Sequence, residues 1–163
     1  MSITDLKTRL AGIAVQAAAP AATADGQVAP AAPAVVETER AARGYVLDVT
    51  VPPERVVDAA RAMDEAKFAL EAITGVDWIA EKQFEVVYDY TLFATGERVV
   101  IRTRVPREKP ELSTICAIYA GANWHEREAH DFFDLVFAGH PDLSPLLLPE
   151  DATFHPLRKD FGA

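Results

Sequence analysis

The amino-acid sequence predicts an α+β fold: a small, mainly antiparallel sheet with helices packed on one face, completed by an extended C-terminal tail. Two observations support this class. Between residues 45 and 105, three stretches alternate apolar with polar side chains, which is the period of a half-buried strand. Apolar residues elsewhere recur at helical spacing, and the elements follow in the order strand–helix–strand–strand–helix–helix. This order is typical of helices segregated to one face of a sheet.

The first of these elements is a strand over 45–51. Pro52 and Pro53 end the strand and open a helix that we expect to run to Thr74, with Gly75 as its C-terminal cap. Strands over 84–92 and 99–105 then form a hairpin around a turn at 94–97. The outer face of one hairpin strand is acidic and that of the other is basic, which favours cross-strand ion pairs. The alternative for these arginines is a docking patch, continued by Arg107 and Lys109.

The pattern becomes helical after Pro110. We expect a short helix closed by Gly121, with Cys116 on its apolar face as a core residue. A second helix runs from Trp124 to about residue 135, and its N-terminus is capped by Asn123 together with Glu126. From Gly139 onward the sequence has four prolines and no lasting periodicity.

The segment before residue 44 has a different character. Apolar residues recur at helical spacing near the N-terminus, so residues 1–16 are expected to form a short helix that could dock on a partner. Residues 17–43 are expected to be an Ala/Pro-rich linker, because 14 of the 23 residues from Ala14 to Val36 are alanine or proline. The α+β domain then covers 44–138, and the tail covers 139–163.

Length and composition restrict the function. The chain of 163 residues suits one domain with tails, and its single cysteine excludes a disulfide framework, a four-cysteine zinc site and a self-contained iron–sulfur cluster. The net charge of −9, all of it carried by residues 44–163, disfavours binding to nucleic acid or anionic membranes. With no apolar run of about eighteen residues, a soluble, intracellular protein is expected.

All four histidines, His125, His130, His140 and His155, lie in the last forty residues among acidic side chains. The zinc-protease motif needs two histidines four apart, whereas His125 and His130 are five apart. The sequence also has no phosphate-binding glycine loop, dinucleotide fingerprint or nucleophile elbow. We therefore predict no catalytic, cofactor-binding or metal-binding residue. The alternative from another class is a small metal-dependent enzyme that uses His130 and His140.

The helix after Asn123 carries an unusual density of charge for an element that is also strongly apolar. One interpretation is local: Arg127 pairs with Asp131 four residues on, and Glu128 complements the helix dipole. The other is that these side chains anchor the tail or a partner by charge-assisted hydrogen bonds. The tail offers matching groups in Arg158, Lys159 and Asp160.

Two motifs in this region resemble a known family. They are Glu126-Arg127-Glu128-x-x-Asp131-Phe132-Phe133 followed after six residues by His140-Pro141-Asp142-Leu143, and His155-Pro156-Leu157-Arg158-Lys159-Asp160-Phe161. Over residues 44–163 the sequence resembles the 30 kDa subunit family of respiratory complex I, whose bacterial members are the C subunits of NADH–quinone oxidoreductase.

The resemblance implies a subunit without catalysis or a cofactor of its own. Such a subunit lies in the hydrophilic arm of a complex I-type NADH:quinone oxidoreductase, at the cytoplasmic face of the membrane, against the large hydrogenase-like subunit and the adjacent iron–sulfur subunit. Iron–sulfur clusters, and flavin or a nickel–iron centre, are then expected in the neighbours. The resemblance assigns a signature and subunit-interface role to Glu126, Arg127, Glu128, Asp131, His140, Pro141, Asp142, His155, Pro156, Arg158, Lys159 and Asp160.

The sequence departs from the family pattern at two places. Asp134 stands where the family usually has glycine, and Ser144-Pro145 stands where it usually has basic residues. The alternative is therefore the equivalent subunit of a membrane-bound energy-converting [NiFe]-hydrogenase or of formate hydrogenlyase, where the electron donor is not NADH.

Overall fold

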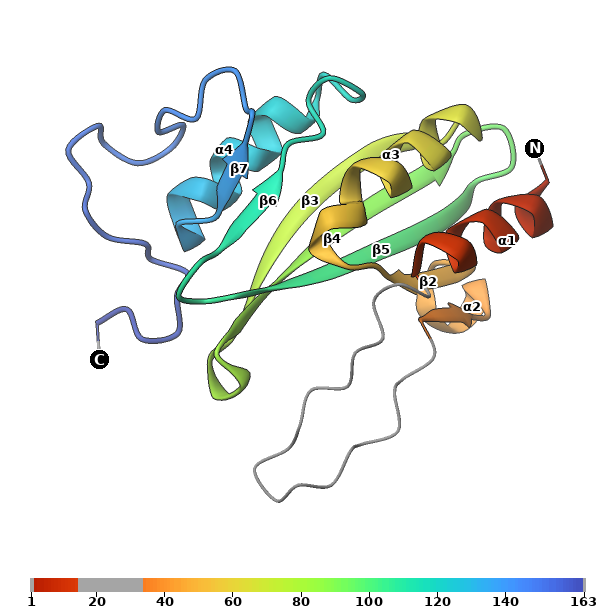
Figure 1. The fold of residues 1–163 in the computed structure, drawn as a ribbon, viewed down its shortest axis with the longest axis horizontal. Coiled ribbons are helices and arrows are strands. Elements are labelled where there is room, and N and C mark those ends of the chain that lie inside the picture. Colours follow the sequence, from red (N-terminus) through yellow and green to blue (C-terminus); the bar gives the residue numbers. More distant parts are fainter. Residues whose placement is uncertain (1, 15–33, 163) are drawn as a thin grey trace.

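Figure 1 shows the computed structural model, which describes residues 2–14 and 34–162. A five-stranded sheet has the order β1-β2-β5-β4-β3. Its β2–β5 pair is parallel, and the other three pairs are antiparallel. This confirms the expected mainly antiparallel sheet. The strands are β1 Val35–Glu37, β2 Leu47–Thr50, β3 Ala69–Trp78, β4 Gln83–Leu92 and β5 Glu97–Pro106.

Helices cover one face of this sheet, as predicted, and Figure 1 shows α1, α3 and α4 on the same side of the strands. The core lies between these two layers and includes the buried side chains of Phe84, Tyr88 and Ile101. Phe133 of α4 meets Phe84 of β4 edge-on, with ring centroids 6.0 Å apart. The helices are α1 Ile3–Ala14, α2 Arg40–Arg43, α3 Val56–Glu65 and α4 Ala122–Phe133, with 3-10 turns η2 Pro53–Arg55 and η3 Ile79–Glu81.

The N-terminal segment differs partly from expectation. The predicted helix is present as α1, and it buries Leu6, Leu10 and Ile13 against the protein's own domain, where it packs on α3 and β2. Of the predicted linker, 17–33 lie outside the described residues. The remainder is not a linker, because β1 pairs with β2 and α2 follows it.

The long hairpin is confirmed as β4 and β5, with Tyr88 opposite Ile101. Its charged face forms the expected cross-strand pairs, since Arg104 Nε lies 3.0 Å from Glu85 Oε1. Arg102 extends the ladder to the next strand, with its Nε 2.9 Å from Asp48 Oδ1.

The helix expected to reach Thr74 instead ends at Glu65, and β3 follows. Lys67 adopts a positive φ of 69°, which stops the helix. Ile73 lies in β3 opposite Tyr88 of β4. As a β-branched residue, it is favoured in a strand. Gly75 is therefore not a helix cap. It lies where a Cβ atom would sit 2.5 Å from Cδ2 of Phe133, so this close approach of α4 to the sheet requires glycine.

The short helix predicted after Pro110 is also absent. β6 Glu111–Ser113 pairs in parallel with β7 Val136–Ala138, and turns follow β6. Helix α4 begins after Gly121, and neither Asn123 nor Glu126 caps it. Leu112 in β6 and Ile115 in the loop after it are buried in the main hydrophobic core, although neither lies on a helix.

From 139 to 162 the described residues form neither helix nor strand, as expected for an extended tail. The tail leaves β7, loops beyond α4 and returns toward the end of the large sheet (Figure 1). Among the described residues, no helix is long and apolar enough to cross a membrane.

Candidate functional site

Three signature side chains of α4, those of Glu126, Arg127 and Asp131, are turned toward the segments that flank the helix. Glu126 is wholly buried, and its Oε1 accepts a hydrogen bond of 2.9 Å from the Ile115 amide. Its Oε2 accepts a bond of 2.5 Å from the Thr114 hydroxyl. Burial raises the pKa of Glu126, although these hydrogen bonds oppose the rise. Glu126 therefore ties the loop after β6 to α4.

Arg127 holds the first turn of the tail. Its guanidinium donates bonds of 2.9 Å to the Ser144 carbonyl and 2.8 Å to the Pro145 carbonyl, and it lies 5.6 Å from the ring centroid of Trp124. The predicted Arg127–Asp131 pair is wrong. The returning tail offers both side chains partners that helical spacing could not reveal.

Asp131 binds the next part of the tail through three backbone amides. Its Oδ2 accepts bonds of 2.9, 2.7 and 3.1 Å from the amides of 146, 147 and 148 in turn. The residue is 3% exposed. Burial alone would raise the pKa of Asp131, but the three N–H donors outweigh it and hold the pKa below its usual value. The carboxylate is thus a charged anchor for an otherwise irregular segment.

The His-Pro-Asp-Leu run starts the tail. The His140 side chain is fully buried, its Nδ1 accepts the Asp142 amide at 3.1 Å, and its Nε2 lies 3.3 Å from the Asn123 carbonyl. The Asp142 carboxylate accepts a bond of 3.2 Å from the Ser144 amide, and bonding to Ser144 lowers the pKa of Asp142. Pro141 is exposed at this turn.

The second motif closes the tail onto the C-terminus of α4. His155 Nδ1 lies 2.8 Å from the Asp131 carbonyl. Arg158 donates 2.9 Å to the Phe133 carbonyl and 3.0 Å to Asp134 Oδ2, so it satisfies a carbonyl that the helix end leaves free. Pro156 between them is half-buried.

The last anchor is buried Asp77 of β3. It accepts a 2.9 Å bond from the Lys159 amide, and its carboxylate also receives Arg107, with both nitrogen–oxygen distances 2.9 Å. Arg107 reaches Asp160 as well, 2.8 Å away. Arg107 therefore joins the sheet to the tail. The sequence pattern indicated it only as part of a possible docking patch and did not predict this role.

The structure gathers most of the predicted residues into this tail anchor: Glu126, Arg127, Asp131, His140, Asp142, His155, Arg158, Lys159 and Asp160 each contact the tail or its flanking loop. Glu128 is exposed on α4 and stands apart. Sequence patterns did not reveal Thr114, Asp77 or the bonding of Cys116, whose Sγ lies 3.4 Å from Glu126 Oε2. Burial raises the pKa of the Cys116 thiol to about 11.

The metal-enzyme alternative needs His130 beside His140. Among the described residues, the ligand atoms that gather closely enough for an ion belong to Cys116, Glu126 and His140. His130 is directed elsewhere, with its Nδ1 3.0 Å from the Leu135 carbonyl. The two histidines of that alternative do not converge.

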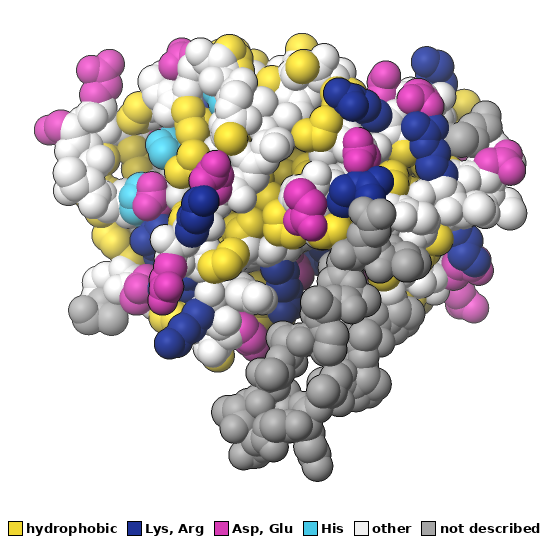
Figure 2. Space-filling model, in the orientation of Figure 1, with side chains coloured by type: hydrophobic (Ala, Val, Ile, Leu, Met, Phe, Trp, Pro, Cys, Tyr) yellow, Lys and Arg dark blue, Asp and Glu magenta, His cyan; other side chains and the backbone are white. Residues whose placement is uncertain are grey.

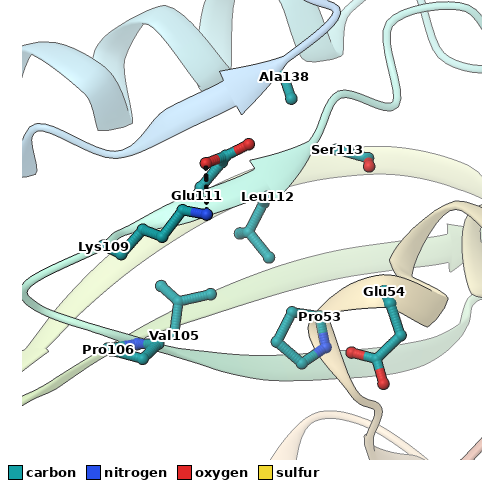
Figure 3. A pocket seen from close by; sticks show the side chains of 9 residues that line it. All are labelled: Pro53, Glu54, Val105, Pro106, Lys109, Glu111, Leu112, Ser113 and Ala138. Atoms are coloured by element: carbon teal, nitrogen blue, oxygen red, sulfur yellow. Dashed lines mark ion pairs between the residues drawn. The ribbon is translucent and has the colours of Figure 1, made fainter.

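A groove elsewhere in the molecule is a weaker candidate. It lies between η2, the end of β5 and β6, where Figure 3 shows Pro53, Val105 and Leu112 around it. Its lysine, Lys109, faces Glu111 at 3.6 Å, and no histidine or cysteine lines it. This groove lacks a set of groups suited to catalysis, so the tail anchor remains the candidate site.

Comparison with known proteins decides the family. The family model described as the 30 kDa subunit of respiratory-chain NADH dehydrogenase matches residues 49–163, which include the whole tail anchor. The chain belongs to this family. The predicted resemblance is confirmed, and the protein is thereby placed among the subunits of multisubunit respiratory oxidoreductases.

Curated relatives agree. The C subunit of NADH-quinone oxidoreductase from Roseiflexus castenholzii is 44% identical over 119 residues, covering 70% of this chain and 68% of the relative. Subunit 5 of the Thermus thermophilus enzyme is 35% identical over 142 residues, covering 76% and 69%. The C subunit of F(420)H(2) dehydrogenase from Methanosarcina mazei is 35% identical over 91 residues, covering 55% and 58%.

Solved structures confirm the fold. A protein of the membrane-bound sulfane sulfur reductase, an archaeal respiratory membrane complex, superposes with a TM-score of 0.69 at 32% identity, covering 79% of this chain and 78% of that one. A trypsin-resistant fragment of Nqo5 superposes with a TM-score of 0.54 at 34% identity, covering 63% and 92%.

Proposed function

We propose that this protein is a non-catalytic structural and assembly subunit in the hydrophilic arm of a complex I-type NADH:quinone oxidoreductase, and that its tail side docks on the large hydrogenase-like subunit. Family membership supports the complex. The observation that carries the docking role is the tail itself: its motif residues His140, His155 and Arg158 bond within the molecule, while large apolar side chains of the tail face outward.

These outward residues lie close together in sequence on the anchored tail. Leu147, Phe154, Leu157 and Phe161 are 60, 43, 53 and 52% exposed. Figure 2 shows hydrophobic side chains beside the histidines on the part of the surface formed by α4 and the tail. Exposed apolar side chains grouped on an ordered segment are typical of a surface that binds another protein.

In this proposal the iron–sulfur clusters and the flavin belong to neighbouring subunits, including the adjacent iron–sulfur subunit. The protein is held at the cytoplasmic face of the membrane by those neighbours. Its role is to present a rigid surface, which the many charge-assisted bonds of the tail anchor make possible.

Two comparisons favour a second candidate, the same subunit in a related complex such as an energy-converting [NiFe]-hydrogenase. One relative is named as the C subunit of an F(420)H(2) dehydrogenase, and the protein from the sulfane sulfur reductase superposes on most of this chain. Identification of the subunits that copurify with the tagged protein separates the candidates: flavin- and NADH-binding subunits indicate the first, a nickel-binding large subunit the second.

The docking surface is tested in host membranes with tagged full-length protein. The double variant Leu147→Asp/Leu157→Asp is expected to lose most of the copurifying large subunit, because it places charge in an apolar interface. The matched control is Phe93→Asp, which changes an even more exposed apolar residue at the β4–β5 turn. Equal recovery with both variants, or a wild-type protein that is free of any cluster-bearing subunit, would refute the proposal.

A further inference from the structure

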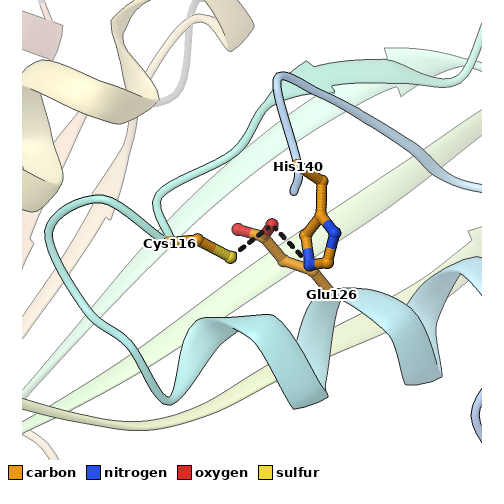
Figure 4. Close-up of side chains that lie close together, drawn as sticks. All are labelled: Cys116, Glu126 and His140. Carbon is orange, nitrogen blue, oxygen red and sulfur yellow. Dashed lines mark hydrogen bonds and ion pairs between the residues drawn. The ribbon is translucent and has the colours of Figure 1, made fainter. Parts of the chain in front are cut away.

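We propose that Cys116, Glu126 and His140 form a binding site for a zinc ion that cross-links three segments of the chain. The site goes beyond the proposed docking role and needs no electron transfer, because Zn²⁺ is redox-inactive. The three residues come from the loop after β6, from α4 and from the start of the tail, and Figure 4 shows their side chains pointing toward one another.

The geometry already approaches that of a metal centre. One ligand atom from each residue lies within 4.8 Å of the other two. Glu126 Oε2 is 3.4 Å from Cys116 Sγ and 3.9 Å from His140 Nε2. Ligand atoms around tetrahedral zinc stand roughly 3.3–3.8 Å apart, given bonds of about 2.0–2.3 Å. The three ligand atoms therefore need to move only a short way to reach the spacing of a zinc site.

The donor set fits zinc better than other common ions. Thiolate, imidazole and carboxylate are its usual ligands, whereas Mg²⁺ and Ca²⁺ prefer oxygen alone. Cys116 is half-buried and gives the ion access, while the Glu126 and His140 side chains are fully buried. A water molecule would complete the fourth position.

In the free protein, the Cys116 thiol and the His140 imidazole each carry a proton that a bound ion would displace. The Cys116 thiol donates to Oε2, and because His140 Nδ1 accepts the Asp142 amide, Nε2 carries the imidazole proton toward the same region. On binding, the thiol proton is released to solvent and the imidazole proton moves from Nε2 to Nδ1. The exposed Asp142 amide then bonds to water, and the neutral imidazole and the thiolate face the ion.

The bonds that hold the Glu126 carboxylate do not have to break, whereas His140 gives up the contact of its Nε2 with the Asn123 carbonyl. Glu126 Oε1 keeps the Ile115 amide, and the Thr114 hydroxyl continues to orient the carboxylate. The turn at Asp142 has to shift on binding, because its amide donates to Nδ1 in the free protein and cannot face a protonated Nδ1. The consequence is a cross-link between the start of the tail and the domain, next to the anchors described above.

The experiment uses the full-length protein, stripped with a chelator and titrated with Zn²⁺ in competition with a chromophoric chelator. We expect one ion per protein molecule with a dissociation constant below about 1 µM. Cys116→Ser and His140→Gln are each expected to weaken binding by more than about tenfold. His125→Gln, on the same helix as Glu126 and outside the cluster, is the matched control and should leave the affinity unchanged.

Cobalt supplies a readout that does not depend on stability. The wild-type protein and the His125→Gln control loaded with Co²⁺ should show a thiolate-to-cobalt charge-transfer band, and the near-isosteric Cys116→Ser variant should not. Circular dichroism confirms that each variant is folded. Absence of stoichiometric binding, absence of the band in the wild type, or an unchanged affinity in folded Cys116→Ser would each overturn the proposal.

Discussion

Replacing Asp131 with asparagine tests whether the tail is held by a buried negative charge. The change keeps the shape of the side chain and one oxygen that can still meet the amides of 146–148. Hydrogen bonds to a charged acceptor contribute about 1.5–3 kcal/mol each, against about 0.5–1.5 for neutral ones. Because the three bonds share one oxygen, their differences do not add fully, and we expect a loss of about 2 kcal/mol for closing this part of the tail.

The assay is hydrogen exchange of the amides of 146–148 in the full-length protein. A loss of about 2 kcal/mol corresponds to roughly 30-fold faster exchange in Asp131→Asn at neutral pH. The control is Asp151→Asn, which neutralises an exposed acid of the same tail and should exchange like the wild type. If the three amides exchange equally fast in the wild type and Asp131→Asn, the charged-anchor explanation is wrong.

The pH dependence follows from the lowered pKa of Asp131. A carboxyl whose pKa is lowered on folding contributes stability that is complete above its unfolded pKa of about 3.9 and is lost as the pH falls through the folded value. The difference between wild type and Asp131→Asn in the free energy of closing the tail should therefore stay constant from pH 7 down to about pH 5. It should vanish in stronger acid. A difference that shrinks between pH 7 and pH 5 would contradict the assignment to this carboxylate.

Two further predictions concern the packing that supports the tail. Gly75→Ala should lower the free energy of unfolding by about 1–3 kcal/mol, because the added methyl meets an α4 phenyl ring, whereas Gly12→Ala in α1, where nothing lies within 4 Å, should not destabilise the protein. Arg107→Ala should lower the free energy of unfolding, measured in urea, by about 3 kcal/mol, because it leaves buried Asp77 without its cation. Arg98→Ala, on the exposed hairpin face, should lower it by less than about 1 kcal/mol. Equal costs for either pair of variants would count against this reasoning.

Local patterns in the sequence were sufficient for the elements that local interactions determine. The β4–β5 hairpin follows from strict alternation around a short turn, and α4 follows from the start signal at Asn123 and Glu126, although the helix begins after Gly121 and neither residue caps it. Residues 66–74 were misassigned because Leu70 and Ile73 are three apart, which fits a helix face, yet pairing with Tyr90 and Tyr88 of β4 decides in favour of the strand. Tertiary pairing overrides periodicity in so short a segment.

The candidate site shows the same division. Sequence motifs identified the charged residues of α4 and the tail, but their partners depend on how the tail returns. Asp131 lies on the same face of the helix as Arg127, but its carboxylate accepts hydrogen bonds from the loop at 146–148 instead. Asp77 and Arg107 had no motif to mark them, because they lie thirty residues apart and meet only in the folded sheet, where β4 separates β3, which holds Asp77, from β5, which ends just before Arg107.

The two departures from the family pattern are explained by the same anchor. Asp134 has a left-handed φ of 62°, the conformation that glycine adopts most easily and aspartate tolerates, and its carboxylate pairs with Arg158 of the tail. Ser144-Pro145 meets Arg127 mainly through backbone carbonyls, which any pair of residues provides. The tail can therefore keep its path while the side chains at these positions change, and the surface it presents to a partner is set by other residues, the exposed apolar ones.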